Sequence, residues 1–156
     1  MKKGLRHVRA CAVIAFLFIY AGALWGIEAH VTADTMVYHS RTGDFTAEGN
    51  VRIQRMELEI TAPMGEGNSQ TGHVILSGGV HIFGKWENEP VDLTSVFLEG
   101  HLSNGGRYSL RENVSGYLGA RIIDAQELEV SESSFIAKKV KKFEDTKQKM
   151  FLSAST

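Results

Sequence analysis

The feature that most constrains the fold is an internal repeat with a spacing of 29 residues. Residues 31–53 read VTADTMVYHSRTGDFTAEGNVRI and align without a gap to residues 60–82, which read ITAPMGEGNSQTGHVILSGGVHI. Eight of the 23 aligned positions are identical, where composition alone predicts roughly one or two. Such a repeat is typical of folds that stack one supersecondary unit, because a single unit cannot bury its apolar face.

Within each copy, apolar and polar residues alternate with the period of two of a half-buried β-strand. Segments 40–44 and 68–72 combine glycine with polar residues and are predicted turns. Gly49 and Gly78 lie inside the alternating runs, where glycine usually marks a bulge or a sharp bend. The alternating positions that form the apolar face of the two copies are Phe45, Ala47, Val51, Ile53, Val74, Leu76, Val80 and Ile82.

The repeat continues more loosely towards the C-terminus. A third copy restarts at Leu93, and the residues Glu-Asn-Val at 112–114 take the place of Gly-Asn-Val at 49–51. A last copy is predicted to begin at Phe135, after a shortened or irregular unit over 119–134. The chain has 16 glycines and two prolines, and no amphipathic helix follows the leader. The predicted fold is therefore all-β, an elongated stack of strand–turn–strand units with a continuous apolar interior.

The N-terminal residues have the composition of an export signal. Four basic residues precede an apolar run that ends at Ile27. The small residues Ala21-Gly22-Ala23 behind the apolar core predict cleavage of a secretory signal. An uncleaved membrane anchor stays open as an alternative, because the run is long enough to cross a bilayer with a slight tilt. Both alternatives divide the chain into a leader, 1–29, and one exported β domain, 30–156.

Charge and motifs argue against a nucleic-acid-binding protein and against an enzyme. Removing residues 1–23 takes away four of the 17 basic residues and none of the 18 acidic ones, which leaves a net charge of −5. An acidic domain has no electrostatic reason to bind nucleic acid. One cysteine excludes an internal disulfide, and the six histidines lack the spacing of a metal site. We find no nucleotide loop or nucleophile elbow and predict no catalytic residue, no metal and no cofactor.

An ordered set of short motifs carries a family resemblance. Ala33-Asp34 is followed by Tyr38, Thr42-Gly43, Ala47-x-Gly49-Asn50-Val51-x-Ile53 and then Ile60-Thr61-Ala62. This set resembles the OstA-like family of periplasmic lipopolysaccharide-transport proteins, which includes LptA, LptC and the N-terminal domain of LptD. The resemblance is clearest over 31–82 and weakens from about residue 84. It implies a β-jellyroll that is open along one side like a folded taco, with no enzymatic activity.

The resemblance also implies a cargo and partners. Acyl chains of lipopolysaccharide would travel in the apolar groove, and edge strands would pair with other jellyroll units of a transport bridge or with further copies of this chain. A cleaved leader favours a soluble, LptA-like bridge component of the periplasm, and an intact one favours an LptC-like component anchored in the inner membrane. A periplasmic β scaffold or adaptor with a solid core is the alternative. The expected groove residues are Phe45, Ala47, Val51, Ile53, Val74, Leu76, Val80, Ile82, Tyr108, Leu110 and Val114.

Two segments depart from the family pattern. The insert Gly-Lys-Trp-Glu-Asn-Glu-Pro at 84–90 is expected to form a loop that carries an exposed Trp86. The lysine-rich segment 138–149 has two interpretations. Its lysines either meet lipid phosphates or an acidic partner, or they lie on a terminal edge strand and discourage uncontrolled sheet pairing. We favour the edge-strand interpretation.

Overall fold

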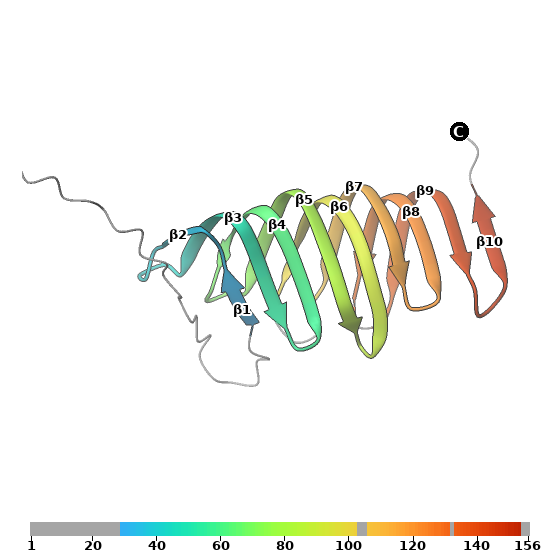
Figure 1. The fold of residues 1–156 in the computed structure, drawn as a ribbon, viewed down its shortest axis with the longest axis horizontal. Coiled ribbons are helices and arrows are strands. Elements are labelled where there is room, and N and C mark those ends of the chain that lie inside the picture. Colours follow the sequence, from blue (N-terminus) through green and yellow to red (C-terminus); the bar gives the residue numbers. More distant parts are fainter. Residues whose placement is uncertain (1–28, 103–105, 132, 154–156) are drawn as a thin grey trace, which may run out of the picture.

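The computed structural model describes residues 29–102, 106–131 and 133–153. These residues form ten strands of one antiparallel sheet, in the order β1-β3-β4-β5-β6-β7-β8-β9-β10, with β2 also paired to β3 (Figure 1). The predicted all-β class is confirmed. The strands are β1 (Ala29–Thr32), β2 (Thr35–Tyr38), β3 (Asp44–Arg55), β4 (Leu58–Asn68), β5 (His73–Trp86), β6 (Glu89–His101), β7 (Tyr108–Leu118), β8 (Arg121–Val130), β9 (Phe135–Asp145) and β10 (Met150–Ser153).

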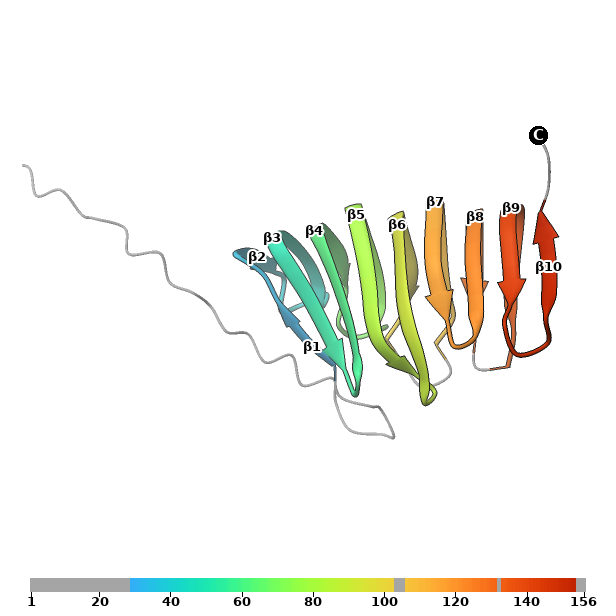
Figure 2. The same ribbon diagram turned by 45° about the vertical axis from the view of Figure 1, so that its right-hand side comes forward.

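The strands follow one another along the long axis of the molecule, so the sheet is elongated and has two ends (Figure 2). β1 and β2 lie at one end and β10 at the other. The predicted leader lies outside the described residues apart from its last residue, Ala29. In the part of the chain that the structure describes, no helix is long and apolar enough to span a membrane.

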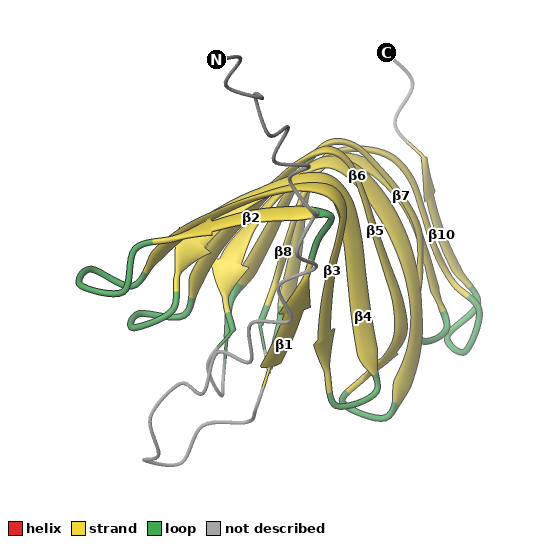
Figure 3. Ribbon diagram, turned by 60° about the vertical axis from the view of Figure 1, so that its left-hand side comes forward, coloured by secondary structure: helices red, strands yellow, loops and turns green. Residues whose placement is uncertain are grey.

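Each long strand bends near its middle, which folds the sheet into two leaves (Figure 3). The register of β3 with β4 shifts between Glu48 and Val51, and that of β5 with β6 shifts between Ser77 and Val80. Gly49 and Gly78 lie within these shifts with φ of 74° and 88°, a region that glycine occupies without steric cost. The bulges predicted at both glycines are therefore confirmed, and their alignment across the sheet forms a crease.

We name the parts of the fold by their position relative to the crease. The inner faces of the two leaves pack together, and the side opposite the crease, where the turns lie, is called the mouth (Figure 3). The first leaf consists of 44–48, 64–68, 73–77, 97–101, 108–111, 127–130 and 135–138. The second leaf consists of 51–55, 58–61, 80–86, 89–94, 114–118, 121–125 and 140–145.

Strand pairing defines the repeat unit in the C-terminal half. Val114 pairs with Ala125 as Val51 pairs with Ala62, so β8 is the counterpart of β4. The expectation of a shortened unit over 119–134 and of a new copy at Phe135 is wrong, because β8 and β9 together form a complete fourth copy. The third copy follows the prediction, since Glu112 and Asn113 have positive φ like Gly49 and Asn50.

Candidate functional site

The interior of the folded sheet is the candidate site. The inward-predicted residues come from β3, β5 and β7 and lie on the inner faces of both leaves. None of their side chains is more than 5% exposed. The structure therefore brings all of them together in one interior: Phe45, Ala47, Val51, Ile53, Val74, Leu76, Val80, Ile82, Tyr108, Leu110 and Val114.

Sequence reasoning missed the residues that the even-numbered strands contribute to the same interior. On β4, Leu58, Ile60 and Ala62 face inward, but the inward parity then changes and Gly65 is the next buried residue. This change of parity coincides with the register shift between Thr61 and Met64, around Pro63. The bulge there inserts an extra residue into β4, which moves the following side chains to the opposite face. β6 and β8 add Val91, Leu93, Leu98, Ile123, Ala125, Leu128 and Val130 to the same interior, which also contains Val31 of β1, Leu118 of β7 and Phe143 of β9.

Glycines on the inner face of the first leaf make room for aromatic rings. A Cβ built on Gly67 would lie 2.9 Å from the ring of Phe45, and one on Gly100 would lie 2.6 Å from Cδ1 of Tyr108. Both distances are shorter than a carbon–carbon contact allows. The rings of Phe45 and Tyr108 therefore occupy the space that a side chain at these positions would need, and the interior is closely packed at both places.

The largely filled interior contains a narrow apolar cavity. Its volume is about 20 Å³, room for roughly one water-sized sphere. Its walls come from both leaves, so the cavity widens only if the leaves move apart. The lining residues are Leu58, Ile60, Ile82, Trp86, Val91, Leu93, Tyr108, Leu110, Leu118 and Val130.

Contacts across the mouth hold the two leaves together. Nη1 of Arg55 on the second leaf donates a hydrogen bond of 3.4 Å to the phenol oxygen of Tyr108 on the first leaf. The ring of Trp86 meets the ring of Tyr108 edge-on, with centroids 5.0 Å apart. The guanidinium of Arg121 lies 5.4 Å from the ring centroid of Phe135. Burial raises the pKa of Tyr108, and the nearby charge of Arg55 only partly opposes this effect. The side chain therefore stays a protonated phenol, whose oxygen accepts the hydrogen bond from Arg55.

Trp86 lies in the hairpin built by the insert at 84–90. The expectation of a loop with an exposed tryptophan is wrong, because β5 extends to Trp86, β6 begins at Glu89, and these two residues pair. Trp86 is half-buried against the core. The insert therefore lengthens a hairpin whose tip lies at the mouth.

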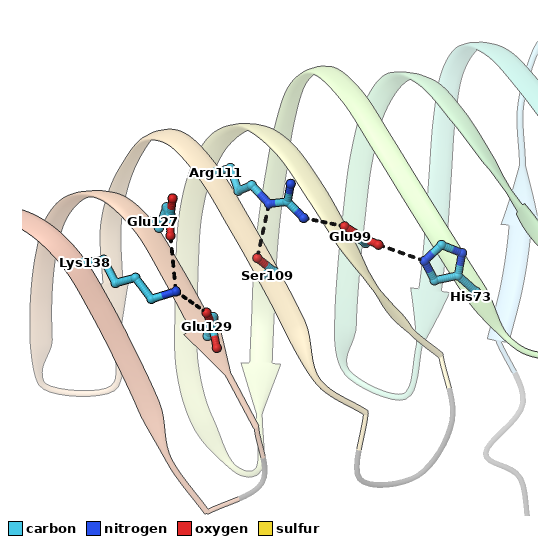
Figure 4. Close-up of polar contacts among 7 residues, drawn as sticks. All are labelled: His73, Glu99, Ser109, Arg111, Glu127, Glu129 and Lys138. Carbon is cyan, nitrogen blue, oxygen red and sulfur yellow. Dashed lines mark hydrogen bonds and ion pairs between the residues drawn. The ribbon is translucent and has the colours of Figure 1, made fainter.

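The outer face of the first leaf carries polar side chains that pair across strands (Figure 4). Nε2 of His73 lies 3.2 Å from Oε1 of Glu99, and Arg111 donates to the other carboxylate oxygen of Glu99. Further along the sheet, Nζ of Lys138 lies 2.6 Å from Oε1 of Glu129 and 3.3 Å from Oε2 of Glu127. No group of three or more His, Cys, Asp or Glu side chains in the described residues is placed to hold a metal ion.

The lysine-rich segment begins on the last long strand, β9. β10 pairs only with residues 142–145 of β9, so Lys138 and Lys139 lie where β9 pairs with β8 alone. The expected edge position therefore holds for these two lysines, whereas β10 covers β9 at Lys142. Lys141 and Lys142 lie 3.9 Å and 3.4 Å from carboxylates of the sheet, those of Asp124 and Glu144.

The geometry defines a class of fold, an elongated open β-jellyroll with an apolar interior. No protein-family model matches the chain, and no curated protein matches its sequence. Among solved structures, the chain is similar to LptH from Pseudomonas aeruginosa, described as the LptA homologous periplasmic component of the conserved lipopolysaccharide transport device. The match has a TM-score of 0.56 at 10% sequence identity and covers 82% of each chain. The fold of this chain is therefore LptA-like.

Proposed function

We propose that this chain is a non-enzymatic lipid-transfer protein of the Gram-negative envelope that carries lipopolysaccharide across the periplasm in its apolar interior. The observation that carries the proposal is one continuous apolar core, from Val31 in β1 to Phe143 in β9, inside a sheet with the fold of an LptA homologue. An extended apolar interior suits a long acyl cargo better than a deep, single binding site, because cargo must also leave.

The energetics of acyl chains explain why such an interior is useful. Each methylene exposed to water costs roughly 0.8 kcal/mol, so a lipid with several acyl chains crosses an aqueous compartment very slowly on its own. The interior offers apolar contact along its whole length and lowers this barrier. Its narrow cavity implies that the leaves part at the mouth, while hydrophilic groups of the cargo stay outside in water.

The leader distinguishes two roles within the proposal. A cleaved leader gives a soluble bridge component that delivers cargo towards the outer membrane, and an intact leader gives an inner-membrane component that passes cargo on. N-terminal sequencing of the exported protein separates these roles. A mature N-terminus at Leu24 or His30 contradicts the anchored role, and an intact N-terminus contradicts the soluble one.

A scaffold with a solid core is the second candidate, and the small cavity volume favours it. In-cell photo-crosslinking decides between the two functions. A photoreactive residue at Ile53 or Val80, both inward, is expected to give a lipopolysaccharide adduct. One at Arg52, whose side chain is 59% exposed on the outer face, is expected to give none. Absence of adducts from a folded, exported protein would exclude the transport function and favour the scaffold.

A substitution tests the same proposal by function. Ile53→Glu or Val80→Glu places a carboxylate in the apolar interior, where acyl chains would meet an uncompensated charge. We expect loss of lipopolysaccharide transport in cells that depend on this protein, with Arg52→Glu as the outward control. A folded Ile53→Glu protein that transports normally would contradict the proposal.

A further inference from the structure

The lysine-rich segment has no part in the apolar interior. Residues 138–149 contain six lysines and two acidic residues, although the chain behind residue 23 carries a net charge of −5. Three of these lysines lie on β9 and contact carboxylates of β8 or β9. Lys147 and Lys149 have no ion pair among the described residues. They lie in the turn between β9 and β10, residues 146–149, which we call the C-terminal tip (Figure 1).

The two carboxylates that directly precede the C-terminal tip are already engaged. Oδ1 of Asp145 accepts hydrogen bonds of 3.0 Å from the backbone amides of Lys147 and Gln148, and Asp145 is buried. The carboxylate of Glu144 lies 3.4 Å from Nζ of Lys142. The C-terminal tip therefore presents two positive charges to water, in a molecule whose net charge is negative.

Hydrogen bonds hold the C-terminal tip in one conformation. The backbone amide and Oγ1 of Thr146 both donate bonds of 3.0 Å to the carbonyl oxygen of Ala120, in the turn between β7 and β8. These bonds act together with the two to Asp145. Because the backbone is fixed beforehand, the tip loses little conformational entropy when it binds a partner.

Large apolar side chains follow the two lysines directly. Met150, Phe151 and Leu152 are 42%, 67% and 57% exposed. Phe151 pairs with Glu144 and Leu152 with the buried Phe143, so exposed apolar side chains lie on both faces of β10. A protein that docks on a sheet covers one face, whereas a lipid layer surrounds an inserted hairpin and covers both.

The other hairpin tips of the second leaf lack this combination. Met56 in the β3–β4 tip is 73% exposed, but its neighbour is the acidic Glu57. The β5–β6 tip carries Glu87, and the β7–β8 tip consists of Gly119 and Ala120. Among the described hairpin tips of this leaf, cations and exposed apolar side chains therefore occur together only at the C-terminal tip.

We propose that the C-terminal tip docks on an anionic phospholipid bilayer. Met150 and Phe151 insert between the headgroups, and Lys147 and Lys149 contact the lipid phosphates. Apolar and aromatic side chains beside lysines are the composition of segments that bind the membrane interface, and juxtaposed lysines add attraction to anionic lipid. The tip stays at the level of the headgroups, where water reaches the free backbone groups of β10.

Docking is compatible with the other roles of this end of the molecule. It uses the turn and the side chains of β10, so the backbone edge of β10 stays available for strand pairing. It also requires no lipid in the interior. The docking of the C-terminal tip therefore holds or fails independently of the proposed transport function.

A fluorophore at the C-terminal tip tests insertion in the full chain. Gln148→Cys in a Cys11→Ser background provides one thiol for an environment-sensitive label such as NBD. With phosphatidylcholine vesicles that contain about 30% phosphatidylglycerol, we expect a blue shift and a roughly twofold rise in emission. Pure phosphatidylcholine vesicles should produce neither change. No change with the anionic vesicles would overturn the proposal.

The same label at Met56→Cys is the matched control, because that tip is equally exposed but lacks lysines. We expect no change in its emission with either kind of vesicle. Binding of vesicles by the apolar leader would affect the two labels alike. Equal changes at both positions would therefore overturn insertion of the C-terminal tip.

Charge variants separate the tip lysines from the net charge of the chain. Lys147→Gln with Lys149→Gln removes two charges from the tip, and Lys141→Gln with Lys142→Gln removes two from β9 in the same segment. We expect the tip variant to weaken binding of the anionic vesicles about tenfold, and the β9 variant less than about threefold. Equal weakening would be an effect of net charge and would overturn the assignment to the tip.

Phe151→Ser tests the apolar contribution and keeps the backbone donors and acceptors of β10. We expect it to weaken binding of the anionic vesicles about tenfold, with Met56→Ser unchanged as the control. Polyglutamate, which is anionic but offers no apolar layer, should not shift the emission of the label at position 148. A shift as large as that with vesicles, or normal vesicle binding by Phe151→Ser, would overturn the bilayer and favour an acidic protein partner.

Discussion

At the scale of single residues, the outer face is organised by charge pairs between neighbouring strands. Lys138 on β9 contacts Glu127 and Glu129 on β8, and Arg111 on β7 contacts Glu99 on β6 (Figure 4). Exposed pairs of this kind contribute little stability individually, because water screens them and their side chains lose entropy.

The pair of Lys138 with Glu129 predicts a pH dependence. The hydrogen bond from Lys138, followed by its charge, holds the pKa of Glu129 below its ordinary value of 4.5. A depressed pKa in the folded state contributes stability above the unfolded value, and this contribution disappears as pH falls through the folded value. We therefore expect Glu129→Gln to be slightly less stable than the native protein at pH 7 and equally stable near pH 3, as measured by urea unfolding.

A double-mutant cycle controls this prediction. Lys138→Met removes the same pair from the other side, so Glu129→Gln should cost almost nothing in that background at pH 7. A cost that is unchanged by Lys138→Met, or that persists at pH 3, would show that the pair is not its source.

The aromatic residues that cover glycines predict a steric effect. A methyl group at Gly100 would lie 2.6 Å from Cδ1 of Tyr108 and 2.9 Å from the carbonyl oxygen of Arg107, so Gly100→Ala must displace the ring and also shift the neighbouring backbone. Overpacking of this kind costs about 1–3 kcal/mol. We expect Gly100→Ala to lower the thermal unfolding midpoint, and Gly100→Ala with Tyr108→Leu to lower it less than the two single effects combined. Simple additivity of the two substitutions would contradict the steric explanation.

At the scale of elements, the crease converts a flat sheet into a folded one. Left-handed residues recur at the bends of the odd-numbered strands: Gly49 and Asn50 in β3, Gly78 and Gly79 in β5, and Glu112 and Asn113 in β7. Lys139 occupies the same region of φ in β9. The bends align because each strand pairs with its neighbours on both sides of the bulge, so one strand cannot straighten alone.

A substitution at the crease tests the role of backbone conformation. Gly79 has φ of 110°, and no atom lies within 4 Å of a Cβ built there, so side-chain space is not limiting. We expect Gly79→Val to reduce the free energy of unfolding by about 1–3 kcal/mol, because a β-branched residue is strained at positive φ. Gly79→Asn, which copies the residue at position 50, should cost clearly less. Equal costs in denaturant unfolding would contradict the backbone explanation.

At the scale of the whole molecule, the sheet ends in strands that have a partner on only one side. β10 pairs with β9, and no further strand of the described residues follows it. Phe151 and Leu152 in β10 are 67% and 57% exposed. Unpaired strand edges recruit further strands, and continuation of the sheet from one molecule to the next would join their apolar interiors.

Edge pairing predicts assembly that depends on concentration. In the full chain with Phe151→Pro and Leu152→Pro, β10 loses two backbone donors, one on each side of the strand. We expect sedimentation velocity to show assemblies of the native protein that are reduced at least severalfold in this variant. Met56→Ser, a change at a 73% exposed residue in a turn, is the control and should assemble normally. Unchanged assembly of the proline variant would exclude β10 as the pairing edge.

Much of the fold follows from local signals in the sequence. The alternation in β3 and β5 identifies their inner residues directly, because the inward parity is the same on both sides of Gly49 and Gly78. In β4, β6 and β8 the buried side chains switch from one set of alternating positions to the other at the crease. Each half of such a strand then shows only two or three alternating apolar residues, which is too short a pattern to recognise in the sequence. The sequence also predicts a loop at Trp86, because the sequence of a hairpin tip does not reveal how far its two strands extend.

The all-β class, the repeat, the turns and bulges, and the inner face of the odd-numbered strands can be read from the amino-acid sequence alone. These properties depend on residues close together in the chain, where the period of two and the conformational freedom of glycine act directly. The size of the interior, the contacts of Arg55 and Trp86 with Tyr108 across the mouth, and two cavities that share Trp86 as a wall become visible only in the folded structure. These features join residues from separate strands, whose distances are set only when the sheet closes on itself.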